Sequence, residues 1–203
     1  MKKVIASVLI LFLLCGCKGK RSVIWENGRF LVATIGVDIK GGEVLVSCEA
    51  VVVNAEDTEQ PPKTVVYEGK GKEFLSAMKR VSQKSPKPLD YSHCALIVFG
   101  ESLSENVKNE VFDYCLNNSE ITVSVGFAQT KNANKLLKLE PVSDIAIGYE
   151  MAVMLETQYN QNKRAFNNRF FEIENARRKG QSIKSLPEFT VKDKTFYLEG
   201  EKN

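Results

Sequence analysis

The sequence predicts an α/β (α+β) fold in which a mixed sheet begins with a β-hairpin and carries packed helices, followed by an incomplete second domain. Three observations indicate this class. A hairpin pattern opens the globular part, which argues against an all-parallel sheet. After residue 71, helix, apolar-strand, helix and strand patterns follow one another, the order typical of a sheet covered by helices. From residue 141 on, two helix patterns and two short strand patterns follow.

The hairpin is predicted from two stretches rich in β-branched residues, 30–39 and 43–53, which flank Lys-Gly-Gly at 40–42. Glycine adopts the positive φ angles that tight hairpin turns need, so the two stretches are expected to pair as antiparallel strands. Residues 55–63 are polar and contain two prolines, which predicts an exposed loop. A third strand is expected over residues 64–69.

The hydrophobic period changes at residues 72–84, and one helical face gathers the apolar positions Phe74, Ala77, Met78 and Val81. The prolines at 86 and 88 end this helix. Residues 93–99 form a continuous apolar run of strand length that closes at Gly100.

A second helix is expected to begin at Ser102, because Glu105 follows three residues later and completes a capping-box pattern. The asparagines at 117–118 end this helix, and its apolar face carries Val107, Val111 and Cys115. Residues 121–130 are expected to form another strand and residues 132–139 a short helix. The first domain therefore spans residues 30–140, ending near Glu140.

Residues 141–203 are expected to form a helical connector and the start of a truncated second domain. The helix predicted at 143–157 is almost entirely apolar between 145 and 155, which favours a core helix buried between two domains. The alternative is a helix that docks on a membrane-protein partner. A long polar and basic helix at 162–179 and two short strands at 188–192 and 195–198 complete this prediction.

The N-terminus has the pattern of a lipoprotein signal peptide, assigned to residues 1–16. Lys2 and Lys3 precede an uncharged apolar run at 4–14, which is too short to cross a bilayer. The following Leu-Cys-Gly-Cys places a large aliphatic residue three positions before Cys17 and small residues directly before it. Cys17 is therefore the predicted lipidation site, and residues 17–29 are a lipidated tether. A plain secretory signal with a chance cysteine is the alternative.

A diacylated Cys17 would hold the mature protein at the extracytoplasmic face of a membrane, because two acyl chains anchor a protein stably. Removing the signal peptide leaves 26 basic and 25 acidic side chains. This near-neutral balance gives no electrostatic argument for a nucleic-acid partner.

Three cysteines remain beyond the anchor: Cys48, Cys94 and Cys115. Their spacing matches no metal-ligand pattern, and no histidine pair accompanies them. Because they fall in apolar strand or helix positions, buried free thiols are the favoured interpretation. A Cys94–Cys115 disulfide stays open as an alternative outside the cytoplasm.

The search for chemistry predicts no catalytic residue, cofactor or metal site, and hence no enzyme. His93 is the single histidine and is interpreted as structural. Gly-Lys-Gly-Lys at 69–72 lacks the P-loop spacing and its Ser/Thr, so its glycines are interpreted as turn residues. The candidate carboxylates Glu101, Glu105 and Glu110 are interpreted as capping or solvated groups.

A cluster of three cations, Arg-Arg-Lys at 177–179, falls at a predicted helix C-terminus, where positive charge complements the helix dipole. A secondary role near anionic lipid headgroups is the alternative.

Several short motifs in order resemble a known family. Ile-Gly-Val-Asp at 35–38 follows the lipobox, Val-Val-Tyr-Glu-Gly-Lys-Gly occupies 65–71, and Phe-Gly-Glu at 99–101 closes the apolar strand. Between and after these motifs lie Ala77, Ser85-Pro86-Lys87, Leu89, His93 and Asn118-Ser119-Glu120-Ile121. Over Cys17 to about Glu140 the chain resembles the Ger(x)C family, the C-subunit lipoproteins of the GerA-type spore germinant receptors.

The resemblance implies a non-enzymatic subunit, lipid-anchored on the outer face of the spore inner membrane, that acts with integral membrane subunits in the response to nutrients. Two features depart from the family pattern. A Lys-Gly-Lys-Arg stretch at 18–21 replaces the family's Trp-Asp-Arg-Glu-like stretch, with Trp25 displaced. Family members are also longer, which makes this chain a shortened relative or a truncated reading frame. The alternative function is a stand-alone extracytoplasmic lipoprotein that binds a small molecule or a cell-wall fragment.

Overall fold

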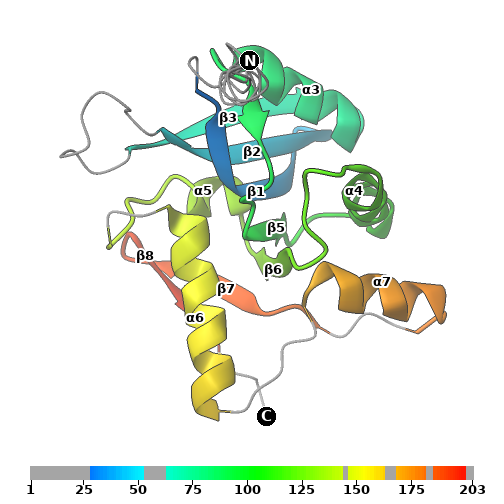
Figure 1. Ribbon diagram of the computed structural model, residues 1–203, viewed down its shortest axis with the longest axis vertical. Helices are drawn as coiled ribbons and strands as arrows, with labels where there is room; N and C mark the ends of the chain where they lie inside the picture. The colour runs from blue at the N-terminus through cyan, green and yellow to red at the C-terminus, as the bar shows by residue number, and fades with distance from the viewer. Residues whose placement is uncertain (1–27, 53–62, 144–145, 163–167, 182–184, 200–203) are drawn as a thin grey trace, which may run out of the picture.

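The computed structural model describes residues 28–52, 63–143, 146–162, 168–181 and 185–199. These residues form one eight-stranded mixed sheet with five helices packed on it (Figure 1). The strands are β1 (Phe30–Lys40), β2 (Glu43–Val52), β3 (Lys63–Gly71), β4 (Leu89–Asp90), β5 (Leu96–Gly100), β6 (Gly126–Thr130), β7 (Glu188–Lys192) and β8 (Thr195–Leu198). The helices are α3 (Phe74–Lys84), α4 (Glu105–Asn117), α5 (Ala133–Leu136), α6 (Ile147–Asn162) and α7 (Phe170–Arg178). The predicted mixed α/β class is confirmed.

The strand order is β3-β2-β1-β5-β6-β7-β8, with β4 beside the start of β1. β1, β2 and β3 are antiparallel neighbours, β1, β5, β6 and β7 run parallel, and β8 returns antiparallel to β7. The hairpin turn was predicted correctly, since Gly41 and Gly42 have φ angles of 66° and 78°. The strands β1, β5 and β6 therefore share an amino edge, where each begins, and a carboxyl edge, where each ends.

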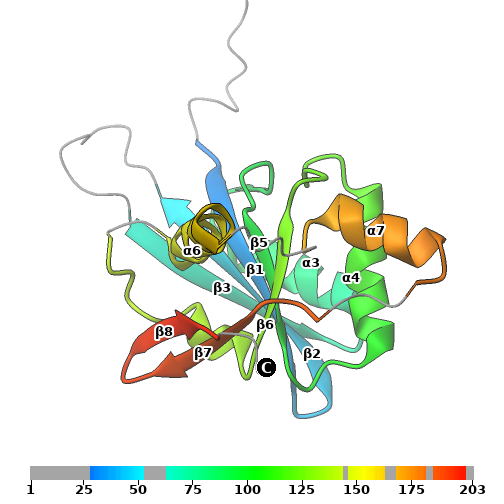
Figure 2. The same ribbon diagram turned by 90° about the horizontal axis from the view of Figure 1, so that it is seen from below.

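Helices cover both faces of the sheet. The larger core lies beneath α3, α4 and α7, and α5 and α6 pack on the opposite face (Figure 2). The inward face predicted for the first helix is confirmed, because all four of its predicted residues are buried: Phe74, Ala77, Met78 and Val81. The predicted helix over 143–157 corresponds to α6, which buries Ile147, Met151 and Leu155 against the sheet.

The glycines at the end of β3 serve close packing, which differs from the predicted turn. A Cβ on Gly69 would lie 2.1 Å from the carbonyl oxygen of Ala77, and one on Gly71 would lie 2.0 Å from Oγ of Ser76. Both positions are within the strand, so α3 can approach β3 only because neither residue has a side chain.

Three predicted boundaries need correction. The cap of α4 is Ser104, whose side chain accepts a hydrogen bond from the Val107 amide, so the helix starts later than the Ser102 pattern predicted. The strand predicted over 121–130 is formed only at Gly126–Thr130, because β5 offers its first partner at Leu96, opposite Gly126. In the region predicted as a long helix over 162–179, the structure describes α7, and residues 163–167 lie outside the described residues.

The incomplete second domain expected after residue 141 is not confirmed. β7 pairs with β6 in parallel, with Gln129 opposite Glu188 and Thr130 opposite Phe189. Phe189 is fully buried in the same cluster as Ile147 of α6. In the part of the chain that the structure describes, the residues after 141 thus extend and cover the first sheet.

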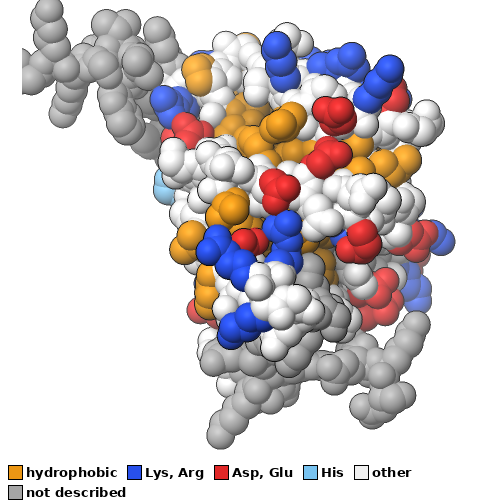
Figure 3. Space-filling model, turned by 90° about the vertical axis from the view of Figure 1, so that its right-hand side faces the viewer, with side chains coloured by type: hydrophobic (Ala, Val, Ile, Leu, Met, Phe, Trp, Pro, Cys, Tyr) orange, Lys and Arg blue, Asp and Glu red, His pale blue; other side chains and the backbone are white. Residues whose placement is uncertain are grey.

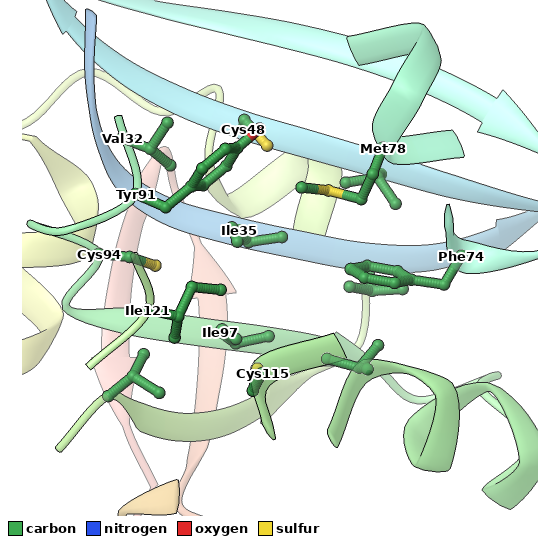
Figure 4. Packing of buried hydrophobic residues seen from close by; sticks show 14 of the residues in the cluster. Val32, Ile35, Cys48, Phe74, Met78, Tyr91, Cys94, Ile97, Cys115 and Ile121 are labelled. Atoms are coloured by element: carbon green, nitrogen blue, oxygen red, sulfur yellow. The ribbon is translucent and has the colours of Figure 1, made fainter. Parts of the chain in front are cut away.

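The three cysteines are buried free thiols, as predicted, and the alternative Cys94–Cys115 disulfide is absent from the described structure. They come from β2, from the turn before β5 and from α4, and their side chains meet other residues of the core (Figure 4). Burial raises the pKa of Cys48 and that of Cys115 to about 12. Groups held neutral in this way are poor nucleophiles, because the thiolate is the reactive form.

Candidate functional site

The predicted lipidation site, Cys17, lies outside the described residues, as do the signal peptide and most of the tether. The structure therefore addresses the domain that this anchor would hold.

The chain enters the fold at the amino edge of the sheet, where it is fixed by several contacts. The Phe30 amide donates to the carbonyl of Pro88 (3.0 Å), and Nζ of Lys87 lies 5.5 Å from the centre of the Phe30 ring. Arg29 forms ion pairs with Asp90 (3.8 Å) and Glu120 (3.4 Å). The entry point is thereby joined to the turn before β5 and to the loop before β6.

Two buried carboxylates inside the hairpin were missed by the sequence analysis. Both oxygens of Glu49 on β2 accept backbone amides at the start of α6, from Ile147 (2.7 Å) and Gly148 (2.9 Å). Asp38 on β1 does the same for α5, accepting from Ala133 (3.0 Å) and Asn134 (2.7 Å). The first amides of a helix have no partner within it, so these carboxylates satisfy groups that would otherwise be orphaned.

Burial raises the pKa of Asp38 and of Glu49, and the donated backbone hydrogen bonds oppose that rise in each case. A raised carboxyl pKa in a cleft is a common mark of a catalytic acid. Here both oxygens of each group are already occupied by amide donors, and the side chains are almost fully buried. Their environment is that of a helix cap.

A polar network links α5 to the antiparallel strands β2 and β3. The side-chain amide of Asn134 donates to Ser47 Oγ (2.7 Å) and to Glu68 Oε1 (2.7 Å), and Lys138 pairs with the same Glu68 oxygen. The hydrogen bond from Lys138, followed by that from Asn134, lowers the pKa of Glu68. The network fixes α5 against β2 and β3.

The other candidates from the sequence are dispersed. The imidazole of His93 is exposed in a turn, and the backbone carbonyl of this residue accepts from the Tyr149 hydroxyl (3.3 Å). Glu110 accepts the Phe74 amide (2.8 Å) at the start of α3, whereas Glu105 pairs with Lys108 (2.7 Å). Glu101 is exposed in the turn after β5. Glu110 thus caps a neighbouring helix, a role that the sequence alone did not assign to it in particular.

The basic cluster at the end of α7 is largely paired. Arg177 contacts Asp113 (3.1 Å) and Glu174 (2.9 Å), and Arg178 contacts Glu174 (2.8 Å). The guanidinium of Arg177 also lies 5.3 Å from the centre of the Phe112 ring. These contacts fasten α7 to α4, in addition to the helix-dipole role predicted from the sequence.

Two of the hollows on the described surface bear on ligand or partner binding. An apolar one of about 440 Å³ lies between α6 and β8 and is lined by Val142, Val153, Met154 and Phe196, among others. A mixed one of about 570 Å³ lies at the amino edge, with Thr122, Ser124, Asn168 and Arg169 in its wall. Among the described residues, no group of three or more His, Cys, Asp or Glu side chains could hold a metal ion.

The comparison with protein-family models identifies a family for this chain. Residues 27–188 match the family model described as the spore germination protein N-terminal domain. No curated protein and no solved structure gives a significant match. Within the described residues, the helices are too short or too polar to span a bilayer.

Proposed function

The chain belongs to the Ger(x)C family through its spore germination protein N-terminal domain, and from this premise we propose that it is a lipid-anchored, non-catalytic subunit of a spore germinant receptor complex. The observation that carries the proposal is the position of the family match. The match begins at residue 27, ten positions after the lipobox cysteine Cys17. A lipidated N-terminus followed at once by this domain is the arrangement expected of such a subunit.

A non-catalytic role is supported by the environment of the two buried acids, Asp38 and Glu49. Asp38 and Glu49 have raised pKa values, yet each is saturated by two backbone amides and closed off from solvent. The buried thiols Cys48 and Cys115 are held neutral. The buried acids thus stabilise the fold by capping helices, and the domain acts by binding other components.

The proposed partners are the integral membrane subunits of the receptor, and the proposed location is the outer face of the spore inner membrane. The lipid anchor on Cys17 would hold the domain beside these subunits. The family assignment supports a membrane-associated role in germination, and the anchor explains how a domain attaches without a spanning helix.

The test is an immunoblot of fractions from dormant spores and growing cells, comparing the native chain with Cys17→Ala. We expect the native protein in the inner spore membrane, with loss from that fraction in the variant. Pull-down of the integral membrane subunits with the native protein completes the test. Absence of the protein from spores would contradict the proposal.

A second candidate is a stand-alone lipoprotein that binds a small molecule or a cell-wall fragment. The mixed hollow of about 570 Å³ at the amino edge favours it, because its volume and its hydroxyl, amide and guanidinium groups suit a polar ligand. A thermal-shift screen with muropeptides and candidate nutrients separates the two. A saturable increase in melting temperature, together with localisation to growing-cell membranes, would favour this candidate.

A further inference from the structure

Three exposed apolar side chains lie on segments that reach the amino edge: Leu116 at the end of α4, Val123 in the loop before β6 and Phe171 at the start of α7. Their exposed fractions are 49%, 66% and 51%. The Phe171 amide donates to the carbonyl of Val123 (3.1 Å), which places these two residues side by side. We call these three residues the amino-edge patch. The surface over α4 and α7 otherwise mixes acidic, basic and hydrophobic side chains (Figure 3).

The patch adjoins the point where the tether enters the fold. Arg29, the residue before β1, forms an ion pair with Glu120, three positions before Val123 in the same loop. Glu120 also accepts the Tyr91 amide (3.5 Å), so the loop is fixed to the turn that precedes β5. Figure 2 shows the start of β1 and the loops before β5 and β6 at one edge of the sheet.

The tether limits how far this edge can lie from the anchor. Phe30 follows Cys17 by 13 positions, and an extended chain spans at most about 3.5 Å per residue, or about 45 Å in total. With Cys17 inserted in the bilayer by its acyl chains, the amino edge is the part of the domain to which the anchored tether is joined.

The charge of Arg29 beside the patch is neutralised locally, because Arg29 pairs with both Asp90 and Glu120. The three side chains of the patch are themselves uncharged, so the patch offers no basic group to anionic headgroups. The partner surface that suits the amino-edge patch is an apolar layer, because aliphatic and aromatic side chains partition into the bilayer at the headgroup boundary.

We infer that the amino-edge patch docks on the lipid bilayer and orients the domain with the amino edge of its sheet toward the membrane. The inference rests on the proposed function, because it takes the acylated Cys17 as the anchor. It adds a second contact with the membrane and assigns the carboxyl edge, with the β1–β2 turn, to the side that points away from the lipid.

The test uses the full chain, purified with its acylated Cys17 and reconstituted in phosphatidylcholine vesicles that contain brominated lipids. Trp25 is the only tryptophan, so Trp25→Phe provides a silent background for two probes, Phe171→Trp and Val123→Trp. The control is Leu75→Trp, since Leu75 is 60% exposed and lies in the first turn of α3, which follows β3 at the carboxyl edge. Circular dichroism checks that each variant folds.

We expect the two patch probes to show blue-shifted emission and quenching by the brominated lipids, while the Leu75→Trp probe is unshifted and unquenched. Adding phosphatidylglycerol or salt should leave this difference unchanged. Equal quenching of all three probes, or none in any, overturns the inference while leaving the anchor intact. Quenching absent in vesicles but shielding from aqueous quenchers in native membranes would assign the patch to a protein partner and also overturn it. A mass spectrum without acyl chains on Cys17 would overturn both this inference and the proposed function.

Discussion

At the scale of single residues, charged side chains inside strands do the work of helix caps. Glu49 stands in the apolar run of β2 and is almost completely buried. Its two oxygens serve the amides of Ile147 and Gly148, which are 98 and 99 positions further along the chain. A strand residue thus determines where a distant helix begins.

Glu49→Ala should lower the free energy of unfolding by about 2–4 kcal/mol, because two buried amides lose their acceptor. Urea denaturation of the mature protein measures the loss. Glu101→Ala is the matched control, since Glu101 is exposed in a turn, and it should change the stability by less than about 0.5 kcal/mol. Equal stability of the two variants would show that the cap contributes nothing.

The pH dependence of stability should reflect the titration of Glu49. Burial, opposed by the two amides, raises the pKa of Glu49 above its ordinary value of 4.5. The folded chain then holds this proton more tightly than the unfolded chain, so the contribution to stability is complete below the ordinary pKa and is lost as the pH rises through the raised one. The nearby charge of Glu150 acts in the same direction.

Glu49→Gln removes this titration, so the variant should lose less stability than the native protein over the pH range above about 4.5. Urea midpoints across that range provide the measurement, and Glu101→Gln should keep the native slope. Parallel curves for the native protein and Glu49→Gln would refute the assignment of the raised pKa to this residue.

The sequence indicates that these two carboxylates need partners, but hydrophobic periodicity alone does not reveal it. Glu49 and Asp38 are charges at inward-facing positions of apolar strands, and such charges need a partner. The partner could not be identified, because it lies on helices that are distant in sequence. The amino-edge patch was missed for a related reason, since Val123 continues an apolar alternation with Ile121 and Val125 that the structure splits into buried and exposed positions.

At the scale of elements, helical periodicity was the most reliable signal and local capping patterns were the least. The buried face of α3 follows directly from its spacing, because only one face of an amphipathic helix can meet the sheet. The start of α4 was predicted two residues early. Ser102 and Ser104 can both act as N-cap residues, and in the structure the N-cap is Ser104.

Replacing the two serines separately tests this correction. Ser104→Ala should cost about 1 kcal/mol, because the Val107 amide loses its acceptor. Ser102→Ala should be close to neutral, within about 0.5 kcal/mol. Urea unfolding of both variants distinguishes them, and a larger loss for Ser102→Ala would restore the cap predicted from the sequence.

The packing of α3 on β3 gives a second prediction for an element. Gly69→Ala would place a methyl group against the Ala77 carbonyl, which is backbone and can move only with the helix. We expect a loss of about 3 kcal/mol from overpacking. Lys70→Ala, at the neighbouring exposed position, is the control and should unfold like the native chain. A Gly69→Ala protein of native stability would mean that α3 tolerates the shift.

At the scale of the whole molecule, the pairing of β7 with β6 shows that the described residues after 141 belong to the same sheet as the first strands. Gln129 and Glu188 are partners in register although 59 positions separate them, and α5, α6 and α7 lie between the two strands. Long-range parallel pairing leaves no local pattern in the sequence. The sequence analysis therefore placed the domain boundary near Glu140, whereas the structure continues its sheet beyond this residue.

Ending the chain after Glu140 tests whether residues 30–140 form a domain of their own. This deletion removes α6 and β7, and with them Ile147, Met151 and Phe189, whose burial covers one face of the sheet. Leu96, Val98 and Ala128 would then face water, at a cost of about 25 cal/mol for each Å² of apolar surface. Since small domains are only marginally stable, we expect the shortened protein to lose its cooperative urea transition. Deleting residues 200–203 alone is the control and should preserve one sharp transition. A cooperative transition of native midpoint after the deletion at Glu140 would instead establish the boundary that the sequence predicted, and α6 would then be a connector whose contacts with the sheet are dispensable.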